Sequence, residues 1–402
     1  MSFRSVKRDV SWVVLAKSLS WLGDSVATIA LMLRLQSHGH GAGAVAALLI
    51  ANALPIVALS GIVGHIVDRY DNRALLVLSS LAQAAVCVVV ATVSATPAVL
   101  ALVALLGAGQ AVNGACWQAL LATIAEGEAL PRAIGRAQAG TTVAGIVAPA
   151  LSGLLVGLYG ARVPLLLDAG AYLLVTAVAL AIATRRVVAA AVPGEKRLGG
   201  VAIVRSDALL RPLFVLLALF VLLGSMVNVV DVFLIRETLG ASTTWYGLAG
   251  AVMFAGMLGG ALLGGRLRGV RSLARGFVGS TVLLAAGLAA TGLVPSVGWI
   301  LPAVAIVGLM NGVLNVTLSS LVLGRTRAEE RGRVGALLSG VASGTQIVAF
   351  AMCGALATAF SPREIFVAAG VLGLLAPVAF GRGLVRSAGD PASAVGPALS
   401  RA

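Results

Sequence analysis

Four polar residues near the N-terminus are spaced so that they share one face of a helix. Lys17, Ser20, Asp24 and Thr28 are separated by three, four and four residues within an otherwise apolar stretch. An ionisable side chain in hydrocarbon costs about 2.5–3.5 kcal/mol on insertion scales, so each is a candidate for function. Asp24 lies near the middle of the stretch, where a partly desolvated carboxyl is expected to load and release a proton near neutral pH. The alternative is structural, with Asp24 paired to Lys17 or to a backbone amide.

Other apolar stretches carry polar groups at similar depth. Asn311, Asn315 and Ser319 repeat every four residues, and Trp117 follows Asn113 by four, where its ring offers a stacking surface. Each amide alone is more often a helix–helix contact than a substrate contact. As a set they favour a central cavity with walls of Leu, Val and Ala, suited to an apolar or amphipathic ligand. The predicted substrate path comprises Ser20, Thr28, Gln110, Asn113, Trp117, Asn228, Asn311 and Asn315.

Charged residues also lie towards the outer ends of the apolar stretches. Arg34 and Asp231 could pair to close an outer gate, or could be solvated at the interface. Asp168 is expected to cap its helix or to pair with Arg162, rather than to take part in coupling.

Cysteine and histidine give no sign of a metal site or of a disulfide framework. All three cysteines fall inside apolar stretches and are predicted to be small packing residues. The three histidines are too few and too scattered to form a metal cage.

These stretches fill most of the chain. Hydrophobic residues make up 59% of 402 and the mean hydropathy is +1.02, which no water-soluble fold could cover with a polar surface. Runs of about 20 apolar residues each predict a membrane-spanning helix. The predicted spans are 11–35, 43–64, 74–94, 98–122, 133–158, 163–184, 210–235, 246–265, 274–293, 298–322, 332–358 and 363–384.

The net charge of +14 follows membrane topology rather than nucleic-acid binding. Among 29 Lys and Arg residues, 24 fall at the ends and loops on one side of the predicted spans. This asymmetry obeys the positive-inside rule and predicts an inner-membrane protein with both termini in the cytoplasm. The five exceptions are Lys17, Arg34, Arg162, Arg236 and Arg363.

The chain is predicted to consist of two related six-helix halves. Gly107 and Gln110 recur as Gly308 and Asn311, in each case 201 residues later, as duplicated transporter halves require. Small residues let membrane helices approach closely, and 256, 260 and 264 in the eighth span are all glycine. The predicted parts are an N-terminal half (1–184), a cytosolic linker (185–209) with a short amphipathic piece, a C-terminal half (210–386) and a disordered tail (387–402).

The loop after the second span reads GHIVDRYDNR and resembles the signature loop of the major facilitator superfamily. Gly64, Asp68, Arg69 and Arg73 match its pattern, and a generic charged turn is the alternative. Gly64 is expected to permit tight packing, and Asp68 to sit at a helix N-terminus. The resemblance implies that this loop governs an inner gate, with the region of Arg331 as its partner.

Within that superfamily the chain looks like the twelve-span drug:proton antiporters related to macrolide and siderophore exporters. The resemblance is carried by Leu22-Gly23-Asp24, Leu165-Leu166-Leu167-Asp168-Ala169 and Arg331-Gly332-Arg333-Val334. Pro149 and Gly153 keep part of the fifth-span antiporter motif, whereas Ala148 and Ser152 replace two of its glycines. Gln110 occupies the region where the family often has an arginine.

The sequence therefore predicts an all-α membrane protein that works by alternating access and exports a hydrophobic small molecule in exchange for protons. Asp24 would carry the proton. No enzyme, cofactor or metal is implied, no nucleic-acid partner is expected, and a monomer in the lipid bilayer is expected. The alternatives are an importer of a polar metabolite and a non-transporting receptor or assembly factor.

Overall fold

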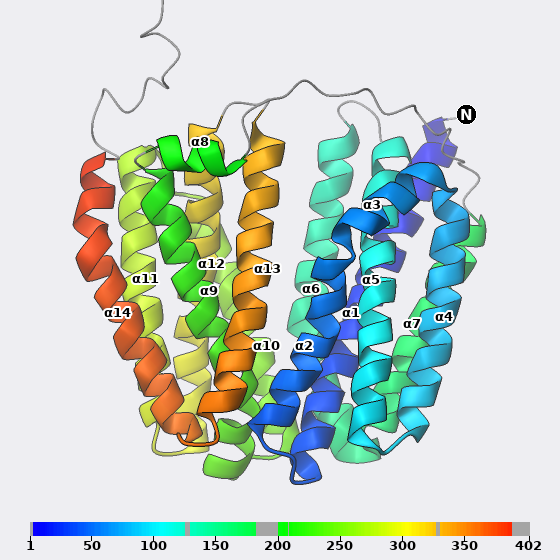
Figure 1. The fold of residues 1–402 in the computed structure, drawn as a ribbon, viewed down its shortest axis with the longest axis horizontal. Helices are drawn as coiled ribbons and strands as arrows, with labels where there is room; N and C mark the ends of the chain where they lie inside the picture. The colour runs from blue at the N-terminus through cyan, green and yellow to red at the C-terminus, as the bar shows by residue number, and fades with distance from the viewer. Residues whose placement is uncertain (1–2, 125–128, 182–199, 208, 327–329, 388–402) are drawn as a thin grey trace, which may run out of the picture. The chain divides into compact units, whose positions relative to one another are not determined.

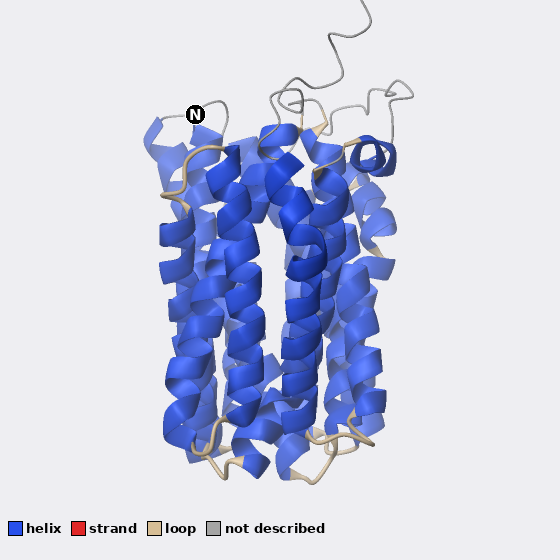
Figure 2. Ribbon diagram, turned by 90° about the vertical axis from the view of Figure 1, so that its left-hand side faces the viewer, coloured by secondary structure: helices blue, strands red, loops and turns tan. Residues whose placement is uncertain are grey.

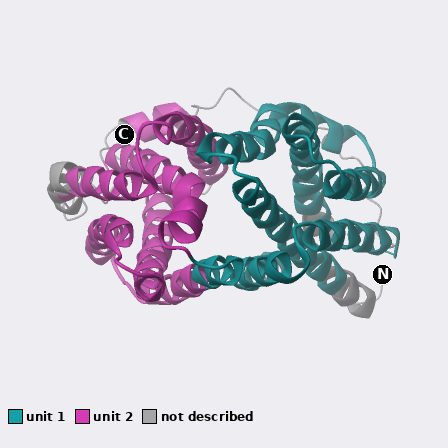
Figure 3. Cartoon of the chain, turned by 90° about the horizontal axis from the view of Figure 1, so that it is seen from below, with its two compact units in different colours: residues 1–192, 241–251 teal, residues 193–240, 252–402 magenta. Residues whose placement is uncertain are grey.

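The described part of the chain folds into helices (Figures 1 and 2). The computed structural model describes the backbone of residues 3–124, 129–181, 200–207, 209–326 and 330–387. Most of the predicted linker and tail thus lies outside the described residues. The helices fall into two compact units, residues 1–192 with 241–251 and residues 193–240 with 252–402 (Figure 3).

The first unit contains the helices that correspond to the first six predicted spans. They are α1 (Phe3–Ser37), α2 (Ala42–Ala58), α3 (Ser60–Arg69), α4 (Asn72–Thr92), α5 (Thr96–Ile124), α6 (Ala129–Tyr159) and α7 (Arg162–Ala181). The short loops join antiparallel neighbours, as expected for a helical bundle.

The second unit begins with the short helix α8 (Gly200–Ser206), which matches the predicted amphipathic piece. Its long helices are α9 (Leu210–Phe233), α10 (Thr243–Gly264), α11 (Val270–Leu293), α12 (Ile300–Arg325), α13 (Arg331–Leu356) and α14 (Pro362–Ser387). A π-helical turn, Leu234–Thr238, continues α9, and the first residues of α10 belong to the first unit.

The same packing pattern occurs in both units. In the first, α1 packs against α6 and α7, and α4 against α5 and α7; in the second, α9 packs against α13 and α14, and α11 against α12 and α14. Gly107 lies on the carbonyl of Asn52, and Gly308 lies on the carbonyl of Met253. Both residues of the second contact lie 201 positions after those of the first, so the same contact is made twice. The predicted relation between the halves is present at the level of single packing contacts.

The second predicted span is not one straight helix. It is broken between α2 and α3, which meet at 50° (Figure 1). Pro55 lies in the last turn of α2, where it has no N–H for the helix ladder and its ring crowds the preceding turn. Ser60 Oγ also donates to the carbonyl of Val57 at 2.8 Å, which competes with the helical hydrogen bond.

The glycine face predicted for the eighth span is confirmed. Gly256 and Gly260 of α10 lie against the backbone of α12, and a Cβ added at Gly256 would come within 2.6 Å of the carbonyl oxygen of Ala305. Gly308 and Gly312 of α12 likewise lie against backbone carbonyls of α10. Without side chains between them the two backbones approach closely, as small residues allow in membranes.

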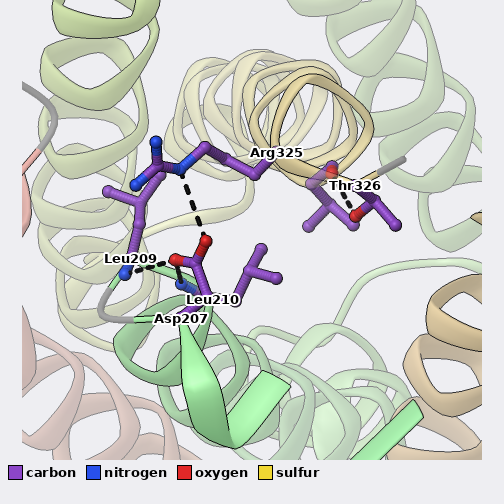
Figure 4. Close-up of polar contacts among 6 residues, drawn as sticks. Asp207, Leu209, Leu210, Arg325 and Thr326 are labelled. Carbon is purple, nitrogen blue, oxygen red and sulfur yellow. Dashed lines mark hydrogen bonds and ion pairs between the residues drawn. The ribbon is translucent and has the colours of Figure 1, made fainter. Parts of the chain in front are cut away.

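A capped junction joins α8 to α9 at one end of the second unit (Figure 4). Asp207 Oδ1 accepts hydrogen bonds from the backbone N–H groups of Leu209 at 2.7 Å and Leu210 at 3.1 Å. Its other oxygen lies 3.6 Å from Nε of Arg325, at the end of α12. One carboxylate therefore holds the start of α9 and the end of α12 together.

The helices are suited to a bilayer. Ten of them, among the described residues, are long and apolar enough to cross a membrane, and the bent pair α2–α3 would make an eleventh. α14, with 26 residues, occupies the position of the twelfth predicted span. Leu78, Leu262 and Leu293 are each at least 65% exposed, which suits contact with lipid rather than with water.

Gly260→Ala is expected to destabilise the protein by about 1–3 kcal/mol, because the new methyl group overlaps the Leu309 carbonyl and the helices must separate. Thermal unfolding of the purified protein in detergent measures the loss. Gly279→Ala in α11 is the matched control, since its Cβ would meet open space. Equal melting temperatures for the two variants would contradict the close approach of α10 and α12.

Candidate functional site

The polar face predicted for the first span lies on α1. Ser20 is buried, whereas Lys17, Asp24 and Thr28 are partly exposed. Thr28 Oγ1 donates to the backbone carbonyl of Asp24 at 2.8 Å. Thr28 thus bonds its own helix in this structure, and its place in a substrate path stays a prediction.

Asp24 is bound by side chains of two other helices. Nε2 of Gln110, in α5, donates to Asp24 Oδ1 at 2.9 Å, and the hydroxyl of Tyr172, in α7, donates to the same oxygen. Its hydrogen-bond partners are therefore neither Lys17 nor a backbone amide, the two partners considered from the sequence. Both donors favour a charged carboxylate, because hydrogen bonds to an ion are stronger than those between neutral groups.

The hydrogen bonds continue from Tyr172 into α4. Nε2 of Gln83 donates to the Tyr172 hydroxyl at 2.7 Å and to the carbonyl of Leu106 at 3.3 Å. Gln83 is 2% exposed and Tyr172 is 1% exposed. Neither was predicted, because a tyrosine and a glutamine on separate apolar helices give no spacing signal in the sequence.

Two amides complete this network, which we call the Asp24 cluster: Asn52, Gln83, Gln110, Asn113 and Tyr172 around Asp24. Asn52 Nδ2 donates to Gln110 Oε1 at 3.3 Å, and Asn113 Nδ2 donates to Gln83 Oε1 at 2.5 Å. Five helices, α1, α2, α4, α5 and α7, therefore meet at one connected set of polar groups. Buried polar groups need such partners, and the partners fix where the helices sit.

Two predicted path residues lie inside the first unit. Asn113 is 5% exposed and also accepts from the hydroxyl of Ser79, so its amide group is fully engaged. Trp117 is 4% exposed and packs in an apolar core with Val13, Leu76 and Val175. Either residue would reach a ligand only after these contacts open, so their place in a path stays a prediction.

The predicted path residues of the second unit are more accessible. Asn228 and Asn315 are exposed, and Asn228 bonds only weakly to its own helix, with 3.4 Å to the carbonyl of Gly224. Asn315 Nδ2 donates to Oδ1 of Asn311 at 2.7 Å, which confirms that these two residues share a helix face. An exposed amide can bind a polar ligand group through its oxygen, or through its N–H groups once they leave these partners.

Arg34 is engaged at the end of α4. Its guanidinium donates to the carbonyl of Val90 at 3.1 Å and to the carbonyl of Val93. These bonds satisfy carbonyls left open at a helix end. Asp231 lies near the end of α9, and its pairing with Arg34 in an outer gate stays a prediction.

The loop between α3 and α4 differs from expectation in two details. Asp68 lies in the last turn of α3, so its predicted position at a helix N-terminus is wrong. Asp71 holds that position, because it is extended at the residue before α4 and accepts from the Arg73 N–H at 3.0 Å. The expected tight packing at Gly64 is also wrong, since an added Cβ would meet no described atom within 4 Å.

The arginines of this loop have different surroundings. Arg73 donates to the carbonyl of Leu180 at the end of α7, and so ties the start of α4 to that helix. Arg69 is exposed at the end of α3. Their role in an inner gate stays a prediction.

Comparison with known proteins identifies the family. The sequence pattern of the Major Facilitator Superfamily matches residues 13–338 and 215–398, so the chain belongs to this superfamily. Its members are transporters and not enzymes. A search of curated proteins found no match.

Solved structures share the fold at low sequence identity. A bacterial homologue of the human lysosomal transporter Spinster is 15% identical, with a TM-score of 0.78 over 99% of this chain and 100% of that one. The nucleoside transporter NupG is 11% identical, with a TM-score of 0.72 over 95% and 99%. A POT family transporter in complex with 5-aminolevulinic acid is 13% identical, with a TM-score of 0.74 over 94% and 96%. The predicted fold class is thereby confirmed.

Tyr172→Phe is expected to lower the unfolding free energy by about 1–3 kcal/mol, because Asp24 and Gln83 both lose a buried partner. Tyr159→Phe is the matched control, since Tyr159 is 65% exposed. Chemical or thermal unfolding of both variants in detergent measures the difference. Equal stability of Tyr172→Phe and the control would contradict a structural role for the Asp24 cluster.

Proposed function

We propose that this protein is a proton-coupled exporter of hydrophobic or amphipathic small molecules. The observation that carries the proposal is the carboxyl of Asp24, which lies on a membrane-spanning helix and binds donors from α5 and α7. Carboxyls at such depth are typical of proton relays in transporters. The sequence resemblance to drug:proton antiporters supports the direction of transport.

Protonation of Asp24 would alter contacts between helices. As a carboxylate, Asp24 accepts two charge-assisted hydrogen bonds that hold α1 to α5 and α7. When a proton binds, the charge is lost and both bonds weaken. A ligand or proton shifts a two-state equilibrium only through such differential contacts. Proton binding at Asp24 would thus favour a different arrangement of α1.

The proposed substrate is apolar because the amides of the first unit bond to one another. Gln110 bonds Asp24 and Asn52, and Asn113 bonds Ser79 and Gln83. The side chains of these helices that remain for contact with a ligand are therefore mostly Leu, Val and Ala. Apolar walls with few polar groups are usual for sites that bind hydrophobic small molecules.

An importer of a polar metabolite is the second candidate. The exposed amides of Asn228 and Asn315 favour it, because each can bind a hydroxyl or carbonyl of a ligand. The similar structures include a nucleoside transporter, which makes labelled nucleosides the first probes. Uptake of a labelled nucleoside by whole cells, without export of hydrophobic dyes, would favour import.

We also propose that both termini face the cytoplasm, that the 64–73 loop forms part of an inner gate, and that the protein works as a monomer in the inner membrane. The charge asymmetry of the chain supports the orientation. The bond from Arg73 to the end of α7 supports a gate that ties two helices at that end.

Asp24→Asn is expected to abolish proton-driven export, because the amide keeps the shape of the carboxyl but cannot bind an extra proton. Inverted membrane vesicles from an efflux-deficient host give the measurement: an imposed pH gradient drives ethidium or a labelled macrolide into the vesicles. At least a tenfold loss of initial rate, about 1.4 kcal/mol, is expected.

Glu364→Gln is the matched control, because it also replaces a carboxylate with an amide. Glu364 is exposed at the start of α14, and the glutamine oxygen can still accept from the Ser361 N–H. Its rate should stay near that of the wild type. Undiminished proton-driven uptake by Asp24→Asn would remove Asp24 from the coupling role. Absence of any flux for the wild type in proteoliposomes would favour a receptor or assembly factor.

A further inference from the structure

A second carboxyl, Asp168 of α7, is buried beside the Asp24 cluster. Its side chain is 1% exposed. The predicted pairing with Arg162 is wrong: Arg162 is exposed at the start of α7, and Asp168 Oδ2 instead accepts from the thiol of Cys87 at 3.3 Å. Asp168 Oδ1 has no hydrogen-bond partner among the described residues.

The unpartnered oxygen faces the backbone of α1. A Cβ added at Gly23 would lie 2.5 Å from Asp168 Oδ1 and 3.1 Å from Cβ of Ala171. Gly23 is therefore needed for α1 to pack over this carboxyl. The contact closes the oxygen off from water.

Such surroundings do not suit a negative charge. An ionised carboxylate needs several donors or a cation when it leaves water, and a single thiol is a weak donor. The titratable groups near Asp168 are Asp24 on α1, Cys87 on α4 and Tyr172 on α7, and none of them is a cation. The charged residues of α6, Arg132 and Arg136, both lie near the start of that helix. A second charge would also be repelled by an ionised Asp24.

We infer that Asp168 is a second proton-binding carboxyl, which holds a proton while α1 is packed over it at Gly23. The neutral acid still bonds to Cys87, and its bare oxygen costs far less than a bare charge. The proton can leave only when α1 and α7 separate enough to admit water. A role of the Asp168 proton in coupling rests on the proposed function, in which α1 moves when Asp24 changes charge.

Infrared spectroscopy of the purified protein tests the inference, because a protonated carboxyl has a C=O stretch distinct from that of a carboxylate. At neutral pH the wild type should show this band, with a small shift in heavy water. Asp168→Asn should remove the band, and the asparagine keeps the shape and the neutral charge of the native acid. The band should remain in Asp24→Asn, which separates the two carboxyls.

Cys87→Ser tests whether the protonated carboxyl is the one that is hydrogen-bonded to Cys87. A hydroxyl is a stronger hydrogen-bonding group than a thiol, so it should shift the frequency of the Asp168 band. Cys116→Ser is the matched control, since Cys116 is also fully buried but packs in a different, apolar core. It should leave the band unchanged.

The inference would be overturned if the wild type lacked the band, or if Asp168→Asn kept it. An unchanged band in Cys87→Ser would also count against it, because the bonded carboxyl must respond to its partner. If the band behaves as expected but vesicles show no proton-driven transport, the second proton site stands and the proposed function fails. The two results are therefore distinguishable.

Discussion

The hydrogen bonds from Tyr172 and Gln110 to Asp24 are the interaction on which the arrangement of the first unit depends. A carboxyl on a membrane-spanning helix must find donors within the protein, because lipid offers none. These donors come from α5 and α7, so one acidic side chain sets the position of three helices. Gln83 and Asn113 extend the requirement into α4, since each buried amide must also be satisfied.

The packing framework is repeated in the two units, but Asp24 and Asp168 have no acidic counterparts at the equivalent positions of the second unit. Gly107 packs against the carbonyl of Asn52, and Gly308 packs in the same way against that of Met253, 201 residues later. At the same offset, Asp24, Gln83, Asp168 and Tyr172 are replaced by Ser225, Leu284, Ala369 and Gly373. Close helix packing thus serves both halves, whereas the Asp24 and Asp168 carboxyls are not repeated at this offset in the C-terminal half.

Much of the fold could be predicted because its signals are local. Apolar runs predicted the helices, and glycines four residues apart predicted the face of α10 that packs closely against another helix. The partners of Asp24 could not be predicted, since Tyr172 lies 148 residues away and its helix carries no pattern that points to α1. The same holds for Asp168, whose nearest cation in sequence is not its partner in space. The break at Leu59 was missed because hydropathy alone cannot show how a proline near a helix end will be accommodated.

The most direct measurement is the movement of protons driven by a substrate gradient. Proteoliposomes that contain a pH-sensitive dye would be loaded with ethidium and diluted, and the internal pH recorded as the ethidium leaves. The account predicts that protons move inward in exchange for ethidium with the wild type, and that this movement is lost with Asp24→Asn. Ethidium efflux with no change of pH in the wild type, or equal proton movement in the variant, would contradict it.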